Sequence, residues 1–222
     1  MRALLPAVLA ALWAAPANPP APSYEDLAVD LLQRYLQIDT TVPPGNELKG
    51  ALFFKDVLDR EGIQVQVDEF APGRANLLAR LPGTGKARPL ILMNHIDVVP
   101  ADAARWKVPP FSGLRQDGLV WGRGAEDMKT EAILQLLAMV RAKREGLKLD
   151  RDLLFLATAD EEAGFAGALR ALSPQGFRAQ LEKAEFLITE GGENIVGESG
   201  RPAFFGVATG EKGPFWLKLQ TT

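Results

Sequence analysis

Three short, largely apolar runs, separated by segments with helical periodicity, constrain the fold of this chain more than any other feature. The runs occupy residues 89–96, 152–160 and 184–190. Apolar runs of this length are typical of strands that are covered on both faces, as in a parallel sheet. Two intervening segments, 128–144 and 163–172, have apolar residues at helical spacing. This alternation predicts an α/β domain with helices packed on a largely parallel central sheet.

The remaining elements are expected on either side of these runs. Helical spacing of leucines and aromatic residues predicts two helices early in the chain, the first with Ser23 as its N-cap. Alternation of apolar and polar residues predicts a half-buried strand after the second helix. The expected helices are 23–38 and 47–62, and the further strands are 63–70, 75–83, 118–124, 202–210 and 214–222.

The first residues predict an export signal that lies outside the fold. Arg2 precedes an apolar segment, and Ala15 and Ala17 form the small-residue arrangement that favours cleavage. The apolar segment is too short to span a bilayer, so no membrane span is expected. The alternative is an Ala-rich N-terminal helix. The expected divisions are a secretory signal peptide over 1–17, a Pro-rich linker over 18–22 and the folded domain over 23–222, exported to the periplasm or secreted.

Charge and cysteine usage exclude several classes of function. The formal net charge is -3 and the sequence contains no cysteine. There is no basic field for nucleic acid, so no nucleic-acid partner is expected. Disulfides, thiolate metal ligands and cysteine nucleophiles are excluded together.

Ionisable side chains fall at or just beyond the ends of the expected strands, among them the only histidine of the chain. In open α/β sheets, sites gather in the crevice outside the carboxyl ends of the strands, so these positions can converge. Each residue alone has an ordinary structural explanation, such as a helix cap. The six residues, here named the strand-end cluster, are His95, Asp97, Asp127, Glu161, Glu162 and Glu190.

Converging carboxylates repel one another unless a cation neutralises them. Carboxylates together with one imidazole favour a divalent metal, with zinc the best match and manganese or cobalt possible. On an extended backbone His95 and Asp97 face the same way, so Asp97 can accept the second imidazole N–H and fix the tautomer. Glu161 and Glu162 point differently in a bent segment, so one can bind metal while the other stays free as a general base.

The segments that contain these residues resemble the M20 family of zinc aminoacylases and carboxypeptidases. They follow in the family's order and cover the chain from about residue 23 to its end. The resemblance implies a three-layer α/β/α sandwich with a mixed, largely parallel sheet, as in zinc peptidases. The matching segments are "TTVPPGNE", "LMNHIDVVPAD", "WKVPPFSGLRQDGLVWGRGAEDMKTEAI", "ATADEEAGFAGA" and "FLITEGGE".

The resemblance also implies a site with two zinc ions. His95 and Glu190 would hold one zinc, Glu162 would hold the second, and Asp127 would bridge both. Asp97 would orient His95.

Further details follow from the same resemblance. Glu161 would be the general base that takes a proton from the attacking water. A cis peptide bond would follow Asp127, and Trp106 would belong to a loop that walls the substrate cleft. The implied activity is hydrolysis of amide bonds, either next to the C-terminal residue of a small peptide or in an N-acyl amino acid.

The family's lid and dimerisation domain and its second zinc-binding histidine are expected after Thr222. Neither is present in these 222 residues. We therefore expect the sequence to be an N-terminal portion of the catalytic domain that is inactive alone, with a homodimer formed through the missing lid.

Two other functions are weighed against this one. A non-catalytic metal-binding module that retains the fold is favoured by the single histidine and opposed by the intact Glu161 and Asp127. A serine hydrolase would use Ser199, but "GESGRP" lacks the spacing of a nucleophile elbow.

Overall fold

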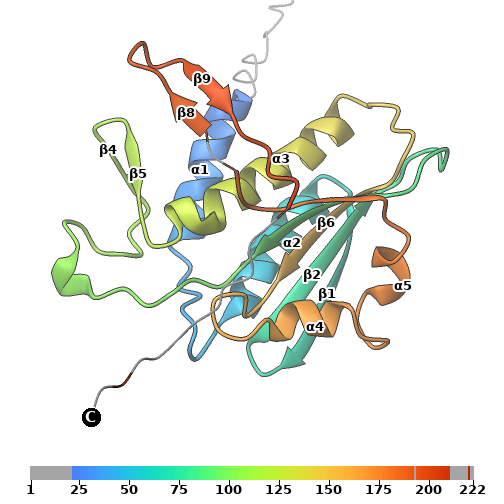
Figure 1. Ribbon diagram of the computed structural model, residues 1–222, viewed down its shortest axis with the longest axis horizontal. Coiled ribbons are helices and arrows are strands. Elements are labelled where there is room, and N and C mark those ends of the chain that lie inside the picture. The colour runs from blue at the N-terminus through green and yellow to red at the C-terminus, as the bar shows by residue number, and fades with distance from the viewer. Residues whose placement is uncertain (1–21, 193, 211–219, 221–222) are drawn as a thin grey trace, which may run out of the picture.

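The computed structural model describes residues 22–192, 194–210 and 220, which form a central sheet with helices on both faces (Figure 1). The predicted three-layer α/β/α architecture with a mixed sheet is confirmed. The expected signal peptide over 1–17 lies outside the described residues. So do most of the linker over 18–22 and most of the β segment over 214–222.

The central sheet has five strands in the order β1-β2-β6-β3-β7. Strand β3 pairs in parallel with β6 and β7, whereas β2 pairs antiparallel with β1 and β6. Strand β2 therefore runs against the other four, and the carboxyl ends of β3, β6 and β7 lie at one edge. The strands are β1 (Gln64–Ala71), β2 (Arg74–Leu81), β3 (Leu90–His95), β6 (Leu153–Thr158) and β7 (Phe186–Ile188).

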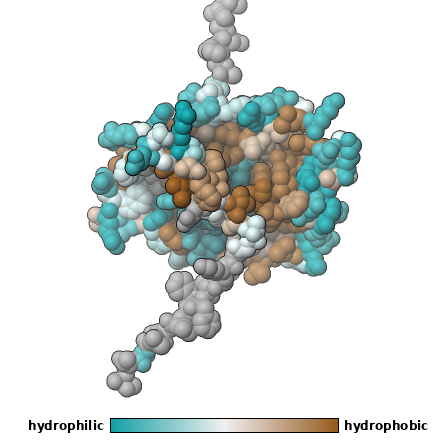
Figure 2. Space-filling view, turned by 45° about the horizontal axis from the view of Figure 1, so that its top comes forward, coloured by the Kyte–Doolittle hydropathy of each residue, from teal (hydrophilic) through white to brown (hydrophobic). Residues whose placement is uncertain are grey.

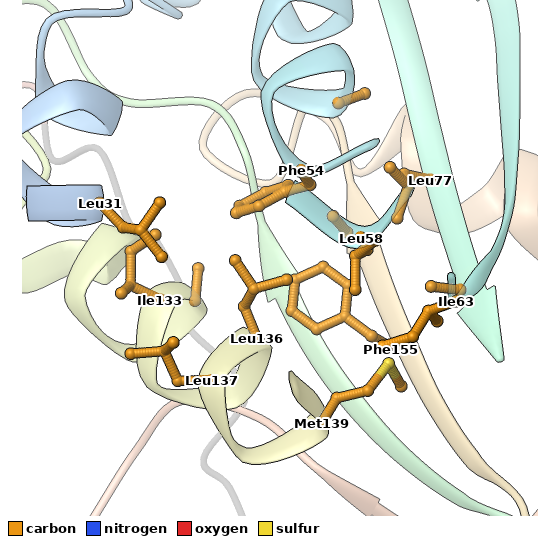
Figure 3. Close-up of a cluster of buried hydrophobic side chains, with 14 of the residues drawn as sticks. Leu31, Phe54, Leu58, Ile63, Leu77, Ile133, Leu136, Leu137, Met139 and Phe155 are labelled. Atoms are coloured by element: carbon orange, nitrogen blue, oxygen red, sulfur yellow. The ribbon is translucent and has the colours of Figure 1, made fainter. Parts of the chain in front are cut away.

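Three helices cover one face of this sheet, and their apolar side chains form the larger core (Figure 3). Phe155 of β6 packs edge-on against Phe54, with 5.2 Å between ring centroids. Leu77 and Phe155 point to this face because alternate residues of a strand do so. Ser23 caps the first helix by accepting from the Asp26 N–H at 3.1 Å, as predicted. The helices are α1 (Tyr24–Leu36), α2 (Glu47–Arg60) and α3 (Thr130–Arg144).

Two short helices, α4 (Ala166–Ala171) and α5 (Arg178–Leu181), cover the opposite face. Leu78 and Leu156, whose neighbours along the strands point to the larger core, pack here with Phe177. The helix observed in place of the predicted helix 163–172 is shorter than expected. It begins at Ala166, because the preceding residues form a turn that starts at Asp160, whose φ is 66°.

The predicted start of one helix and the predicted burial of one strand are wrong. The helix predicted from Met128 begins at Thr130, because Asp127 and Met128 have non-helical backbone angles inside the turn η2 (Ala125–Lys129). The third apolar run was predicted to be a buried strand, yet Phe186 is 55% exposed. In the described part of the chain β7 is an edge strand that pairs only with β3, and this leaves its side chains uncovered.

The peripheral elements are two hairpins and one 3-10 turn. Figure 2 shows a broad apolar area on one face of the molecule, and the exposed apolar side chains include members of the second hairpin. None of the helices in the described ranges is long and apolar enough to cross a membrane. The elements are η1 (Ala103–Arg105), the pair β4 (Leu114–Gln116) and β5 (Leu119–Trp121), and the pair β8 (Asn194–Val196) and β9 (Pro202–Phe205).

Candidate metal centre

The structure brings the strand-end cluster together at the carboxyl ends of three parallel strands. His95 is the last residue of β3, and Glu190 follows the end of β7. Glu161 and Glu162 lie in the turn after β6, and Asp127 lies in the turn η2 that leads into α3. The parallel pairing of these strands places positions far apart in sequence at one edge of the sheet.

His95 is buried and stands at the centre of the cluster. Its Nε2 lies 3.0 Å from Oδ1 of Asp127, 3.5 Å from Oε2 of Glu190 and 4.0 Å from Oε2 of Glu161. Its Nδ1 lies 3.0 Å from the backbone oxygen of Asp97. A carbonyl oxygen only accepts, so Nδ1 carries a proton and donates it, and Nε2 faces the carboxylates.

The Asp97 side chain differs from its expected role. Its carboxylate was predicted to accept the second imidazole N–H, but Oδ1 lies 3.8 Å from Nδ1 of His95, and the shorter contact is with the Asp97 carbonyl. The carboxylate instead accepts the backbone N–H groups of Glu161 and Glu162, each at 3.0 Å. Asp97 therefore orients the imidazole through its backbone and holds the acidic turn through its side chain.

A second set of contacts, which sequence reasoning missed, supports the same turn. The Arg74 guanidinium donates to Oε2 of Glu47 at 2.8 Å and also to Asp160, whose other oxygen accepts the Ala166 N–H at 3.1 Å. Burial raises the pKa of Glu47, against the opposing effect of its hydrogen bonds. No local pattern connects Arg74 with these partners, so only the packed structure reveals the arrangement.

Lys129 anchors the turn that positions Asp127. The peptide bond between Asp127 and Met128 is cis, as the resemblance implied. Lys129 is fully buried and donates to the carbonyl oxygens of Tyr35 at 3.1 Å and Ile38 at 2.7 Å. Burial lowers the pKa of Lys129 to about 7. The lysine thus ties the end of α1 to the turn that presents Asp127.

The electrostatics of the cluster favour positive charge at its centre. Burial opposes the charged form of His95, but the hydrogen bond to Glu190 and the charges of Glu190, Asp97 and Glu161 raise the pKa of His95 to about 10. The hydrogen bond with His95 lowers the pKa of Glu190, whereas burial raises the pKa values of Glu161 and Glu162. Carboxylates gathered in this way are also stabilised by a divalent cation.

The donor set fits a divalent metal. Among the described residues, ligand atoms within 4.8 Å of one another form two groups, His95 with Asp127 and Glu190, and His95 with Glu161 and Glu162. One imidazole nitrogen with carboxylate oxygens is the donor chemistry that zinc and similar ions accept. The first group contains the residues expected around one zinc. Glu162 is grouped with Glu161 and not with Asp127.

A family model described as peptidase family M20/M25/M40 matches residues 91–209, a range that contains the whole strand-end cluster. The chain belongs to this family. It is 31% identical to aminoacylase-1 from Sus scrofa over 201 residues, which are 89% of this chain and 47% of that protein. The chain thus spans about half the length of the curated relatives it matches. The predicted membership of the M20 family is confirmed.

Solved structures of M20 proteins support the same fold. An M20 family metallo-carboxypeptidase from Sulfolobus solfataricus superimposes with a TM-score of 0.66 at 22% identity, over 78% of this chain and 39% of that one. A Bacillus subtilis protein described as a dinuclear metal binding peptidase from the M20 family gives a TM-score of 0.54 at 16% identity, over 75% and 42% of the two chains.

Proposed function

We propose that the protein hydrolyses amide bonds in small peptides, next to the C-terminal residue, or in N-acyl amino acids, with two divalent metal ions, zinc above all. The observation that carries this proposal is the convergence of one imidazole and four carboxylates around Nε2 of His95. The similarity to aminoacylase-1 supports the choice of substrates.

The residues of the strand-end cluster divide into two kinds of role. His95, Asp127, Glu162 and Glu190 would hold the metal ions. Bound divalent metal supplies Lewis acidity that activates water and polarises the scissile carbonyl.

Glu161 is the general base of the proposed mechanism. Its side chain is about one-third exposed, at 35%, and burial raises the pKa of its carboxyl above the usual value. A raised pKa brings a carboxylate closer to the operating pH, where it accepts and returns a proton more effectively. Glu161 would take a proton from the attacking water and deliver it to the departing amine. Asp97 positions it through the backbone hydrogen bond at 3.0 Å.

Export is a separate proposal. It is supported by the N-terminal sequence, in which Arg2, an apolar segment and the small residues Ala15 and Ala17 have the order of a secretory signal peptide. Determination of the N-terminal residue of the mature protein tests it, and cleavage after Ala17 is the expected result.

The activity is tested on the complete protein loaded with zinc. We expect release of free amino acid from N-acetyl amino acids or dipeptides, loss of that activity in a chelator, and recovery on addition of zinc. Activity that survives strong chelation contradicts the proposal. Metal binding without hydrolysis of either substrate class would favour a non-catalytic metal-binding module.

A further inference from the structure

Strand β2 runs against β6, so the first residues of β2 lie beside the acidic turn, residues 159–165, that joins β6 to α4. Leu77 pairs with Ala157, and the two strands continue from this pair to Arg74 and to Asp160. The only antiparallel partner of β6 in the described sheet therefore brings side chains to the turn that contains the proposed base.

Asp160 has a backbone conformation that depends on its contacts. Its φ is 66°, in the left-handed region that is uncommon for residues other than glycine. Its carbonyl accepts the N–H groups of Gly164 at 3.1 Å and Phe165 at 2.6 Å, and its carboxylate accepts the Ala166 N–H at 3.1 Å. Such a conformation persists where the surrounding structure determines it. Glu161 follows directly, so the contacts of Asp160 set the direction in which the chain enters Glu161.

Arg74 is the cation that holds the Asp160 carboxylate. Its Nη2 donates to Oδ1 of Asp160, and its Nε donates to Oε2 of Glu47 at 2.8 Å. The Arg74 side chain is 19% exposed, and the Glu47 side chain is fully buried. A planar guanidinium that donates in two fixed directions cannot rotate without breaking one of the two bonds. Glu47 is the first residue of α2, so Arg74 ties the acidic turn to a helix of the larger core.

The Glu47 carboxylate is buried at a cost to stability. Its Oε1 has no hydrogen-bond partner among the described residues, and an unpaired buried oxygen destabilises the folded state. The bend before α2 leaves little room around the pair, because a Cβ at Gly45 would lie 2.5 Å from Nε of Arg74 and 2.7 Å from Oε2 of Glu47. A positioning role explains this arrangement better than a contribution to stability does.

Asn76 holds the two ends of the same turn. It lies on the same face of β2 as Arg74, because alternate residues of a strand point the same way. Its Oδ1 accepts the Ala159 N–H at 3.0 Å, and its Nδ2 donates to the Gly167 carbonyl at 2.8 Å. With both ends fixed in this way, the contact between Arg74 and Asp160 determines how the turn is oriented between them.

We infer that Arg74, held by Glu47, is a positioning residue that sets the direction of the proposed base, Glu161, by fixing Asp160. This inference rests on the proposed function and deepens it. In the described part of the chain, Arg74 forms side-chain hydrogen bonds with Glu47 and Asp160 and none with the strand-end cluster, so it acts through the turn. A displacement of about 1 Å costs roughly 100-fold in rate. The expected signature is a lower kcat with little change in KM.

Steady-state kinetics on the zinc-loaded complete protein test the inference, with N-acetyl amino acids and dipeptides as substrates. In Arg74→Lys, which keeps the charge but not the two fixed donor directions, kcat should fall roughly 10–100-fold while KM changes less than about twofold. Glu47→Ala should lower kcat in the same way. Glu47→Gln keeps an acceptor for Arg74 and should recover most of that loss.

Arg144→Lys is the matched control for these variants. Arg144 donates to both oxygens of Glu61, at 3.0 Å and 2.5 Å, and so forms an ion pair between the ends of two helices and outside the acidic turn. The substitution disturbs a bidentate ion pair in the same way, but kcat should stay at the value of the parent protein. An equal fall of kcat in Arg144→Lys and Arg74→Lys would overturn the inference.

Hydrogen exchange of backbone amides, with zinc added to the complete protein, gives a readout that does not depend on activity. In Arg74→Lys the amides of Gly164, Phe165 and Ala166 should exchange roughly 10-fold faster or more, while the amides of β6 keep the rate of the parent protein. Arg144→Lys should leave the turn unchanged. Faster exchange over the whole sheet in Arg74→Lys would indicate a general loss of stability and would overturn the inference.

The two readouts separate this inference from the proposed function. If the parent protein hydrolyses either substrate class and Arg74→Lys keeps both its kcat and the slow exchange of the turn, the inference is overturned and the proposed function stands. If the parent protein hydrolyses neither class, the proposed function is overturned. Fast exchange confined to the turn would then still show that Arg74 positions it, and slow exchange would overturn that as well.

Discussion

The backbone N–H of Glu161 donates to Oδ1 of Asp97 at 3.0 Å, so a buried aspartate after β3 holds the proposed base after β6. The neighbouring N–H of Glu162 occupies the other oxygen of the same carboxylate. The carbonyl of Asp97 meanwhile accepts from Nδ1 of His95. One residue thus sets the positions of the histidine and of two carboxylates relative to one another.

Replacing Asp97 with Asn should reduce activity without removing a metal ligand. Asparagine has one carbonyl oxygen, so its NH₂ group faces one of the two N–H donors and a hydrogen bond is lost. We expect kcat/KM to fall about 10–100-fold, as for other residues that orient metal ligands. Steady-state hydrolysis and metal analysis check this. Asp117→Asn, at an exposed position between β4 and β5, is the control. Unchanged kinetics would show that the acidic turn does not depend on Asp97.

Replacing Glu161 with Gln removes the proposed base while keeping the shape of the side chain. We expect kcat to fall about 10²–10⁴-fold, the usual contribution of general acid–base catalysis. The zinc content should be retained, because four other residues of the strand-end cluster would hold the metal. Kinetics and metal analysis of the same preparation check both parts. Glu145→Gln, at an exposed position after α3, should behave as the parent. Near-normal turnover in Glu161→Gln would assign the base to another residue.

Removing the metal should destabilise the folded protein. The cluster exists only when β3, β6 and β7 are assembled, so zinc binds the folded state and shifts the equilibrium toward it. At free zinc about 100-fold above Kd the stabilisation is about 2.7 kcal/mol. A thermal melt with and without chelator measures this difference.

His95→Ala is the matched variant for that melt, since His95 belongs to both groups of candidate ligands. Its melting temperature should respond to chelator much less than that of the parent. An equal response in both proteins would place the stabilising metal elsewhere.

The sequence predicted the strand-end cluster because the relevant rule is topological. Once three runs are assigned to parallel strands, the residues that follow them must meet at one edge, whatever the details of packing. The contacts that orient the cluster could not be predicted in this way. Arg74 and Asp160 are 86 positions apart, and their ion pair depends on the pairing of β2 with β6.

The predictions for one helix and one strand were wrong because apolar patterning reports burial and does not report backbone angles or the place of a strand in a sheet. Met128 is as buried as a residue of α3, so the apolar period runs through it, yet its backbone is not helical. The β7 run is as apolar as β6. Composition does not reveal that β7 lies at an edge of the described sheet, whereas β6 lies inside it.

Gly167→Ala should destabilise the fold close to the acidic turn. A methyl group at this position would overlap the backbone nitrogen and oxygen of Ala159, which are not free to move because Ala159 directly follows β6. Overpacking of this kind costs about 1–3 kcal/mol. Urea unfolding followed by circular dichroism measures it. Gly197→Ala is the control, since its nearest neighbours would be 3.7 Å away. Equal unfolding midpoints for the two variants would contradict the expected overlap.

The free energy of unfolding should depend on pH through the Asp152 carboxyl, which does not belong to the strand-end cluster. Although burial opposes it, the Gly83 N–H at 2.8 Å and the Arg80 guanidinium at 2.7 Å hold the pKa of Asp152 below its usual value. A carboxyl with a lowered pKa stabilises the fold above its unfolded pKa of about 3.9, and this contribution disappears as the pH falls through the folded value.

Asp152→Asn should therefore cost about 1 kcal/mol at pH 7, a modest value because Arg80 is half exposed. The difference from the parent protein should shrink as the pH falls below about 4, since the unfolded parent then binds a proton at Asp152 that its folded state does not bind until the pH reaches the lower folded value. Urea unfolding of both proteins from pH 7 to pH 3 measures this difference. Asp150→Asn is the control, because its carboxylate makes side-chain contacts no shorter than 3.3 Å. A difference that stays constant over this range would mean that the charge of Asp152 does not contribute.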